Sequence, residues 1–439
     1  MVHPSHVIRG RATQLLRGKR IVIGVSGSIA AIEVPKIVRE LLRHGADVHA
    51  VMSGEGARLI SPEALEFATG HPPILQLTGN VEHVTFLGPG EGRADLYAIV
   101  PATANTISKI AHGIDDTPVT SFASVALGGG VPMLIAPAMH SHMGVNPAVR
   151  ENLEKLRSWG VGIVSGASAE GEDKVAGPEE VAAAILHRLA AGPWAGRKVV
   201  VVGGASRESI DSVRSVTNES SGATAVALAN QAHYRGADVL LMAGTLQVPV
   251  PPWIAVDRWR SVEDLLSLAR RHRADLAASA AVIVPAALSD YTLDPLPGKI
   301  PSREHATLTL TLRRAPKVLP ELRRLAPPPS RLVAFKLESG LTTSELEREA
   351  RRLADESHAD WVVANDVATM GSPETTALVL PRGGDRRWIR GPKAEFAGKL
   401  LDDIGRDLQN LDASASAPAS RERPARRRAT GRRPSQAHR

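Results

Sequence analysis

The sequence predicts an α/β fold built from two doubly wound parallel-sheet domains, and three observations point to it. Short apolar runs that suit buried strands alternate with amphipathic stretches of about 10–15 residues that suit helices. Aromatic residues form only 3% of the 439-residue chain, so Val, Ile, Leu and Ala must fill the core, as in strands covered on both faces. The alternation stops at a Gly- and Pro-containing break near residues 187–196 and then starts again, which predicts two domains.

The first predicted domain covers residues 1–188. Its first strand leads through Ser26-Gly27-Ser28 into an amphipathic helix, and its third strand leads through a PATAN segment at 101–105 into another. The strand candidates are Ile21–Val25, Asp47–Met52, Leu96–Val100 and Pro132–Ala136.

The second predicted domain covers residues 196–410. A Gly pair at 383–384 predicts a hairpin between Ala377–Leu380 and Arg387–Ile389, and a last helix is expected from about Lys393 to Leu408. The other strand candidates are Lys198–Val202, Asp238–Met242, Ala281–Val284, Leu332–Phe335 and Trp361–Ala364.

The positive charge gathers at the end of the chain. Lys and Arg number 53 and Asp and Glu 46, a net charge of +7, and residues 421–439 alone hold eight Arg and one Glu. The rest of the chain is therefore neutral, which argues against a folded nucleic-acid-binding surface. We expect residues 411–439 to form a disordered basic tail. Weak, salt-sensitive contact of this tail with RNA is the alternative to a purely solvated tail.

Cysteine is absent, which excludes disulfides, Cys-ligated metal sites and a Cys nucleophile. No secretory signal is visible at the N-terminus. The longest near-apolar run, Ala277–Leu288, is too short to cross about 30 Å of hydrocarbon. We therefore expect a cytoplasmic protein without a membrane partner.

Small polar residues follow several predicted strands. Gly27 and Ser28 follow the first strand, Ser53 the second, and Thr103 and Asn105 the third. The carboxyl edge of an open α/β sheet binds ligands, and backbone N–H groups at helix starts bind phosphate. The pattern favours a mononucleotide-like ligand over ordinary tight turns.

A second polar group follows the first strand of the second domain. It contains Gly204 and Ser206, and a Ser220-Ser221-Gly222 segment before a predicted helix. A nucleotide-phosphate cradle and a plain helix cap both explain this pattern.

Longer motifs resemble one enzyme family. The segments GVSGSIAA (24–31), PATANTISK (101–109) and PAMHSHMGVNP (137–147) resemble flavin-dependent cysteine decarboxylases. The segments NESSG (218–222), AALSDY (286–291), GKI (298–300) and ANDV (364–367) resemble phosphopantothenate–cysteine ligases. Their order is similar to that of the bifunctional phosphopantothenoylcysteine decarboxylase/phosphopantothenate–cysteine ligase family of coenzyme A synthesis, and longer runs look most like archaeal members.

For the first domain, the resemblance implies a flavodoxin-like flavoprotein that binds FMN and decarboxylates phosphopantothenoylcysteine. It implies His83 as the catalytic base, since a His pKa lies near neutral pH. The implied substrate contacts are Met139, His140 and Asn146. The implied FMN contacts are Gly27, Ser28, Ser53, Thr103, Ala104 and Asn105.

For the second domain, the resemblance implies a ribokinase- or Rossmann-like ligase that uses CTP and Mg²⁺ to join 4′-phosphopantothenate to cysteine through an acyl-cytidylate. Lys299 and Asn218 are the implied catalytic residues, and the metal ligands remain unknown. The implied CTP contacts are Gly204, Ser206, Ser220, Ser221, Gly222, Asp290, Lys299, Pro316, Lys317, Val318, Leu319 and Phe335.

The chain departs from the family pattern in both domains. The family's substrate-flap Cys, a proton donor, has no counterpart, and His140 or Lys174 of the 165–177 segment are the candidate replacements. The ligase motif SSGKMG is absent after Ser220, and lysines that grip the triphosphate are missing near Leu353 and Ser357. Arg351 and Arg352 are either substitutes or part of a solvated helix face.

Bifunctional coenzyme A synthesis is the leading interpretation. The alternatives are a decarboxylase with a degenerate ligase half and a non-catalytic FMN-binding regulatory subunit. The resemblance also implies a homo-oligomer with trimeric contacts through the first domain and dimeric contacts through the second.

Overall fold

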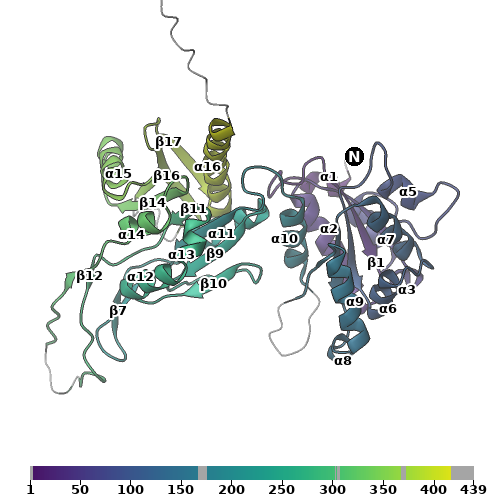
Figure 1. Cartoon of the computed structure of the whole chain (residues 1–439), viewed down its shortest axis with the longest axis horizontal. Helices are drawn as coiled ribbons and strands as arrows, with labels where there is room; N and C mark the ends of the chain where they lie inside the picture. Colours follow the sequence, from purple (N-terminus) through teal and green to yellow (C-terminus); the bar gives the residue numbers. More distant parts are fainter. Residues whose placement is uncertain (1–2, 167–175, 302, 304–306, 367–371, 417–439) are drawn as a thin grey trace, which may run out of the picture.

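The computed structural model describes residues 3–166, 176–301, 303, 307–366 and 372–416. Two α/β bodies lie side by side, the first at the right of Figure 1 and the second at the left. Each contains one large sheet covered by helices on both faces. The predicted fold class is confirmed.

The first sheet has five parallel strands in the order β2-β1-β3-β4-β5. Ile21 of β1 lies opposite both Val48 of β2 and Leu96 of β3, so β1 is central and buried. This order is that of flavodoxin-like sheets, whose ligand site lies where the strand order reverses, between β1 and β3. The bounds are β1 Arg20–Val25, β2 Asp47–Met52, β3 Leu96–Ala102, β4 Met133–Pro137 and β5 Gly162–Ile163.

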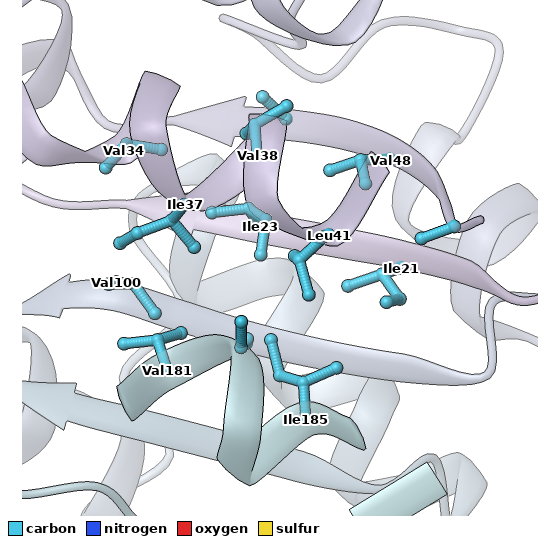
Figure 2. Close-up of a cluster of buried hydrophobic side chains, with 14 of the residues drawn as sticks. Ile21, Ile23, Val34, Ile37, Val38, Leu41, Val48, Val100, Val181 and Ile185 are labelled. Atoms are coloured by element: carbon cyan, nitrogen blue, oxygen red, sulfur yellow. The ribbon is translucent and has the colours of Figure 1, made fainter. Parts of the chain in front are cut away.

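Helices α2 (Val34–Arg43) and α10 (Pro178–Leu189) cover one face of this sheet. Figure 2 shows their aliphatic side chains meeting those of β1, β2 and β3. Helices α6 (Ala104–Ala111), α7 (Pro118–Gly129) and α9 (Pro147–Ser158) cover the other face. The remaining elements are α1 Pro4–Ile8, η1 Ile29–Glu33, α3 Gly54–Leu59, α4 Pro62–Thr69, α5 Glu82–Leu87 and α8 Ser141–Gly144.

A charged cluster at the amino end of β2 stabilises the opposite edge of this sheet. Asp47 accepts hydrogen bonds from His49 at 3.2 Å and His71 at 3.0 Å, and it also pairs with Arg9 and Arg20. These contacts, chiefly the His49 hydrogen bond, hold the pKa of the Asp47 carboxyl well below its usual range, although burial alone would raise it.

The second sheet has eight strands in the order β10-β9-β6-β11-β14-β15-β16-β17. The first six are parallel and follow the 3-2-1-4-5-6 order of the Rossmann fold, and an antiparallel hairpin extends them. The bounds are β6 Lys198–Gly203, β9 Asp238–Ala243, β10 Ala255–Arg258, β11 Ser279–Val284, β14 Arg331–Glu338, β15 Trp361–Asp366, β16 Glu374–Pro381 and β17 Arg387–Pro392.

Helices α11 (Ala223–Tyr234) and α16 (Lys393–Ser416) cover one face of the second sheet. The other face carries α12 Val262–Arg271, α13 Arg273–Ala277, α14 Val318–Leu325 and α15 Thr343–Ser357. Two small antiparallel ribbons, β7 (Arg207–Ser209) with β8 (Ser215–Thr217) and β12 (Tyr291–Thr292) with β13 (Arg313–Arg314), lie outside the large sheet. In Figure 1, β12 lies on an arm that extends away from the sheet.

The predicted start of the basic tail at residue 411 is wrong. Helix α16 continues to Ser416, because Leu411 still packs against the core that α16 shares with α11. Residues 417–439, which hold the Arg-rich segment, lie outside the described part of the chain. Within the described part, no helix combines the length and apolar character that crossing a membrane requires.

The two bodies are joined by a segment that packs into the second body. Trp194 is 2% exposed, and its Nε1 donates to the Leu401 carbonyl at 3.0 Å. The rings of His187 and His233 stack across the junction with centroids 4.4 Å apart. Burial, and secondarily the nearby His187, lowers the pKa of His233 to about 4.

Candidate active sites

The first candidate site is a cavity of about 440 Å³ at the carboxyl edge of the first sheet. We call it the first cavity. It lies at the end of β1 and β3, where an open α/β sheet of this strand order binds its ligand. Every residue predicted to contact FMN lines it, namely Gly27, Ser28, Ser53, Thr103, Ala104 and Asn105.

Helix starts converge on the first cavity. The side chains of Ser28, Ser53 and Thr103 cap η1, α3 and α6, and each accepts a hydrogen bond from a backbone N–H two or three residues later. Thr117 and Thr120 bring the start of α7 to the same cavity. The remaining N–H groups of these helix starts give a positive potential that suits a phosphate.

Two small residues after β1, Ser26 and Gly27, fix the backbone next to the first cavity. The buried Ser26 hydroxyl donates to the Pro101 carbonyl at 2.8 Å and accepts from the Thr103 N–H at 3.0 Å, so it ties β1 to β3. A Cβ on Gly27 would lie 2.4 Å from the Cβ of Glu55, so only glycine lets α3 pack this close to the turn after β1. The cavity and the surrounding N–H donors fit a phosphate-bearing cofactor such as FMN.

The predicted substrate contacts reach the first cavity only in part. Met139 lines it, whereas His140 and Asn146 are exposed and cap α8 and α9. The rings of His140 and His142 stack with their Nδ1 atoms 3.2 Å apart.

The structure does not bring His83 to the first cavity. His83 lies on α5, half-buried, and its Nδ1 is shielded from solvent without a hydrogen-bond partner among the described residues. Lys174, the other candidate proton donor, lies outside the described residues.

The second candidate site consists of two adjoining cavities at the carboxyl edge of the second sheet. The outer cavity has a volume of about 690 Å³ and the inner cavity about 160 Å³. Both are lined by Phe335 and Lys336 in the second half of β14. The predicted catalytic residue Asn218 lines the outer cavity. Predicted nucleotide contacts line the outer cavity at Asp290, Pro316, Lys317, Val318 and Leu319, and the inner cavity at Ser220, Ser221 and Gly222.

Three predicted ligase residues lie outside these linings. Gly204 has a φ of +87° in the turn after β6. The buried Ser206 hydroxyl accepts from the Ser289 N–H at 2.9 Å, so it supports the segment that leads to Asp290. Lys299 is exposed and lines neither cavity.

Charges of both signs line the outer cavity. Lys317 lies 4.0 Å from Asp290, and Lys336 lies 2.7 Å from Glu338. Arg352 lines the cavity between Glu349 and Glu356, each at 2.7 Å. The side chains of its cations are thus already paired with carboxylates.

Sequence reasoning missed Lys336 and Lys393. Lys336 directly follows Phe335 at the carboxyl end of a predicted strand, which is a usable signal. Lys393 lines the inner cavity from the start of α16, and only the β16–β17 hairpin brings it there. Of the two arginines proposed as substitutes, Arg352 lines the outer cavity and Arg351 does not.

These features define a two-domain α/β enzyme. Its first domain has a flavodoxin-like sheet, and its second domain has the strand order of a Rossmann fold with cavities suited to a nucleotide. The Flavoprotein family model matches residues 9–190, and the model of the DNA/pantothenate metabolism flavoprotein C-terminal domain matches residues 194–408. The chain belongs to the family of bifunctional coenzyme A biosynthesis proteins, CoaBC.

The relatives align over almost the whole chain. CoaBC of Thermococcus kodakarensis is 41% identical over 415 residues, covering 93% of this chain and 100% of that protein. CoaBC of Methanocaldococcus jannaschii is 35% identical over 408 residues, 92% of this chain and 98% of that protein. A solved C-terminal domain of CoaBC is 25% identical, with a TM-score of 0.42, and covers 50% of this chain and 100% of that chain.

These matches confirm the predicted family, its archaeal character and the two enzymatic halves. The chain is a bifunctional decarboxylase and ligase of coenzyme A biosynthesis, and its first half is a flavoprotein domain. The degenerate and non-catalytic alternatives are not favoured.

Proposed function

We propose that the chain converts 4′-phosphopantothenate into 4′-phosphopantetheine in two steps. In the second domain, a substrate carboxylate attacks the α-phosphorus of CTP and releases pyrophosphate, and the amine of cysteine then displaces CMP. In the first domain, the cysteinyl carboxylate leaves as CO₂. One observation carries the proposal: residues from separate segments, chosen from the sequence alone, line cavities at the carboxyl edges of both sheets.

FMN fits the first cavity through its phosphate. The helix starts at Ser28, Ser53 and Thr103 offer N–H donors, and Gly27, which has no side chain, lines the same cavity. When bound, FMN supplies a reversible two-electron acceptor that makes loss of the carboxylate feasible.

We place His83 at the flavin of a neighbouring subunit. His83 does not reach its own cavity, yet its Nδ1 is buried and unpartnered among the described residues. Large apolar side chains are exposed close to the cavity, with Ile29 at 70% and Met143 at 49%, and on α5 beside His83, with Val84 at 44%. These surfaces suit a trimeric contact that buries them and completes the site.

The stacked His140 and His142 are the proposed contacts for the substrate carboxylate, together with Asn146. An imidazole can donate a hydrogen bond to a carboxylate and can also return a proton to a carbanion. His140 therefore remains the candidate that replaces the absent Cys.

The outer cavity is the proposed CTP site, and its charges favour a metal-bound nucleotide. Its cations already face carboxylates, so a bare triphosphate would meet Asp290 and Glu356 without a surplus of positive charge. Mg²⁺ bridges phosphates readily with few protein ligands and would offset this repulsion.

Asn218 and Lys299 are the proposed catalytic residues of the ligase. The Asn218 amide donates to the Leu288 carbonyl at 2.9 Å, which holds its side chain at the cavity wall. Because Lys299 is exposed and lines neither cavity of its own chain, we propose that it serves the cavity of a dimer partner.

The test is release of CMP and pyrophosphate from CTP, 4′-phosphopantothenate and cysteine, together with the flavin absorbance of the purified protein. His83→Asn should abolish decarboxylation and spare CMP release, and Lys299→Gln should do the reverse. A colourless protein would refute the FMN site, and absence of CMP would refute the ligase. Oligomer mass by light scattering tests the proposed contacts between subunits.

A further inference from the structure

The inner cavity contains a lysine that the proposed mechanism has not used. Lys393, the first residue of α16, lines it together with Thr375 of β16 and Asn365 of β15. The segment that leads into α11, including Ser220 and Ser221, also lines this cavity. These elements come together only after the β16–β17 hairpin returns the chain to this edge of the sheet.

Lys393 carries its charge without a counter-ion. Lys317 and Lys336 each lie within 4.0 Å of a carboxylate, but Lys393 forms no ion pair with any described residue. Its Nζ donates to the backbone carbonyl of Ser372. Burial, with no opposing carboxylate, lowers the pKa of the Lys393 ammonium. A half-buried cation of this kind is stabilised when an anion occupies the adjacent space.

The inner cavity has the size and lining for a compact anion. Its volume of about 160 Å³ is too small for a nucleoside but sufficient for a phosphoryl group. Among its lining residues the only carboxylate is Glu219, which is exposed. Its hydroxyl and amide groups can share the hydrogen bonds that a phosphoryl oxygen accepts.

We propose that Lys393 and the inner cavity form a phosphoryl subsite of the ligase, opening onto the outer cavity at Phe335 and Lys336. The proposal rests on the proposed ligase function, and the phosphoryl group has two chemical sources. One is the triphosphate of the nucleotide, and the other is the phosphate monoester of the acid substrate. In either case Lys393 supplies a positive charge to the phosphoryl group. The family pattern places lysines on α15 for this purpose, but this chain has Leu353 and Ser357 near those positions.

Labelling of the wild-type protein tests the subsite without turnover. Lysines of the full-length protein are acetylated with limiting acetic anhydride, and modification of Lys393 and Lys399 is read by mass spectrometry. Lys399 is the internal control, since it lies on the same helix and pairs with Glu395 at 2.6 Å. Pyrophosphate, CTP or 4′-phosphopantothenate should slow labelling of Lys393 at least threefold and leave Lys399 unchanged. Equal labelling of Lys393 with and without all three compounds would overturn the proposal.

The probes separate the two sources. Protection by pyrophosphate and CTP assigns the subsite to the nucleotide. Protection by 4′-phosphopantothenate but not by pantothenate, which lacks the phosphate, assigns it to the acid substrate. Because labelling needs no product, an inactive ligase would still give a result, so failure of the subsite and failure of the proposed function remain distinguishable.

Substitutions of Lys393 test the subsite through the KM values of the ligase substrates. Lys393→Met should raise the KM of the assigned substrate about tenfold or more, the typical value of one charged hydrogen bond, and leave the KM of cysteine unchanged. Lys393→Arg should recover most of the loss, and Lys399→Met should match wild type. Thermal unfolding of each variant controls for the lost contact with Ser372. A folded Lys393→Met protein with unchanged KM for both phosphorylated substrates would refute the subsite.

Discussion

Acidification from pH 7 to pH 5 should destabilise the junction between the two domains through His233. The pKa of this imidazole is lowered from 6.5 to about 4 in the folded chain, first by burial and then by the neighbouring His187. The folded state therefore resists a proton that the unfolded state accepts. Stability is fully present above about pH 6.5 and is lost as the pH falls toward 4.

The magnitude follows from linkage. At pH 5 an unfolded histidine is almost fully protonated, whereas His233 in the folded chain is about nine-tenths neutral. The difference in proton binding costs about 2 kcal/mol between pH 7 and pH 5. His233→Phe keeps an aromatic ring against His187 but removes the titrating group, so its stability should fall less over this interval.

Urea denaturation followed by tryptophan fluorescence measures the effect. The ring of Trp253 lies 6.4 Å from that of His233 and reports on the junction. Other titrating groups affect wild type and variant equally, so the quantity of interest is the difference between their two pH dependences. His112→Phe, at the exposed C-cap position after α6, is the matched control and should follow wild type. Parallel pH dependences for wild type and His233→Phe would refute the reasoning.

Three further predictions concern the sheet edges. Ser26→Ala removes both hydrogen bonds of the buried Ser26 hydroxyl, so the free energy of unfolding in urea should fall by about 1–3 kcal/mol and the bound flavin should decrease. Unchanged stability would contradict the proposed link between β1 and β3. Gly27→Ala should lower flavin absorbance per chain because its Cβ has no space, whereas Gly54→Ala, with nothing within 4 Å of its Cβ, should keep full flavin; equal occupancy would contradict the close approach. In Asp47→Asn, the free energy of unfolding should decrease less steeply below about pH 4 than in wild type. The lowered pKa of Asp47 contributes stability to the folded state, and this contribution is lost as the pH falls through that pKa. The same decrease in wild type and variant, measured by unfolding at several pH values, would count against this.

Strands that are buried on both faces could be predicted from the sequence, whereas short or exposed strands could not. The central strands of both sheets read as continuous aliphatic runs, because helices cover them on each side. Strand β5 escaped prediction because it has only two residues, and β10 because its Ala-Val-Asp-Arg sequence is largely exposed. Pattern reasoning has no apolar run to find in either place.

The candidate sites divide in a similar way. Ser28, Ser53 and Thr103 were predictable because each caps a helix directly after a parallel strand, and parallel strands end at one edge. Lys393 was not, since its approach to the inner cavity depends on the antiparallel pairing of β16 with β15 and β17. The positions of His83 and Lys299 depend on other subunits in the proposed assembly, which one chain does not contain.

The anchoring of Trp194 determines how the two active sites cooperate within one chain. A linker whose indole is inserted into the second domain cannot act as a swinging arm, so neither domain carries an intermediate to the other. The acyl-cysteine product must diffuse between two fixed openings. A coupled assay should consequently show a short lag before 4′-phosphopantetheine forms, and added free decarboxylase should be able to intercept part of the flux.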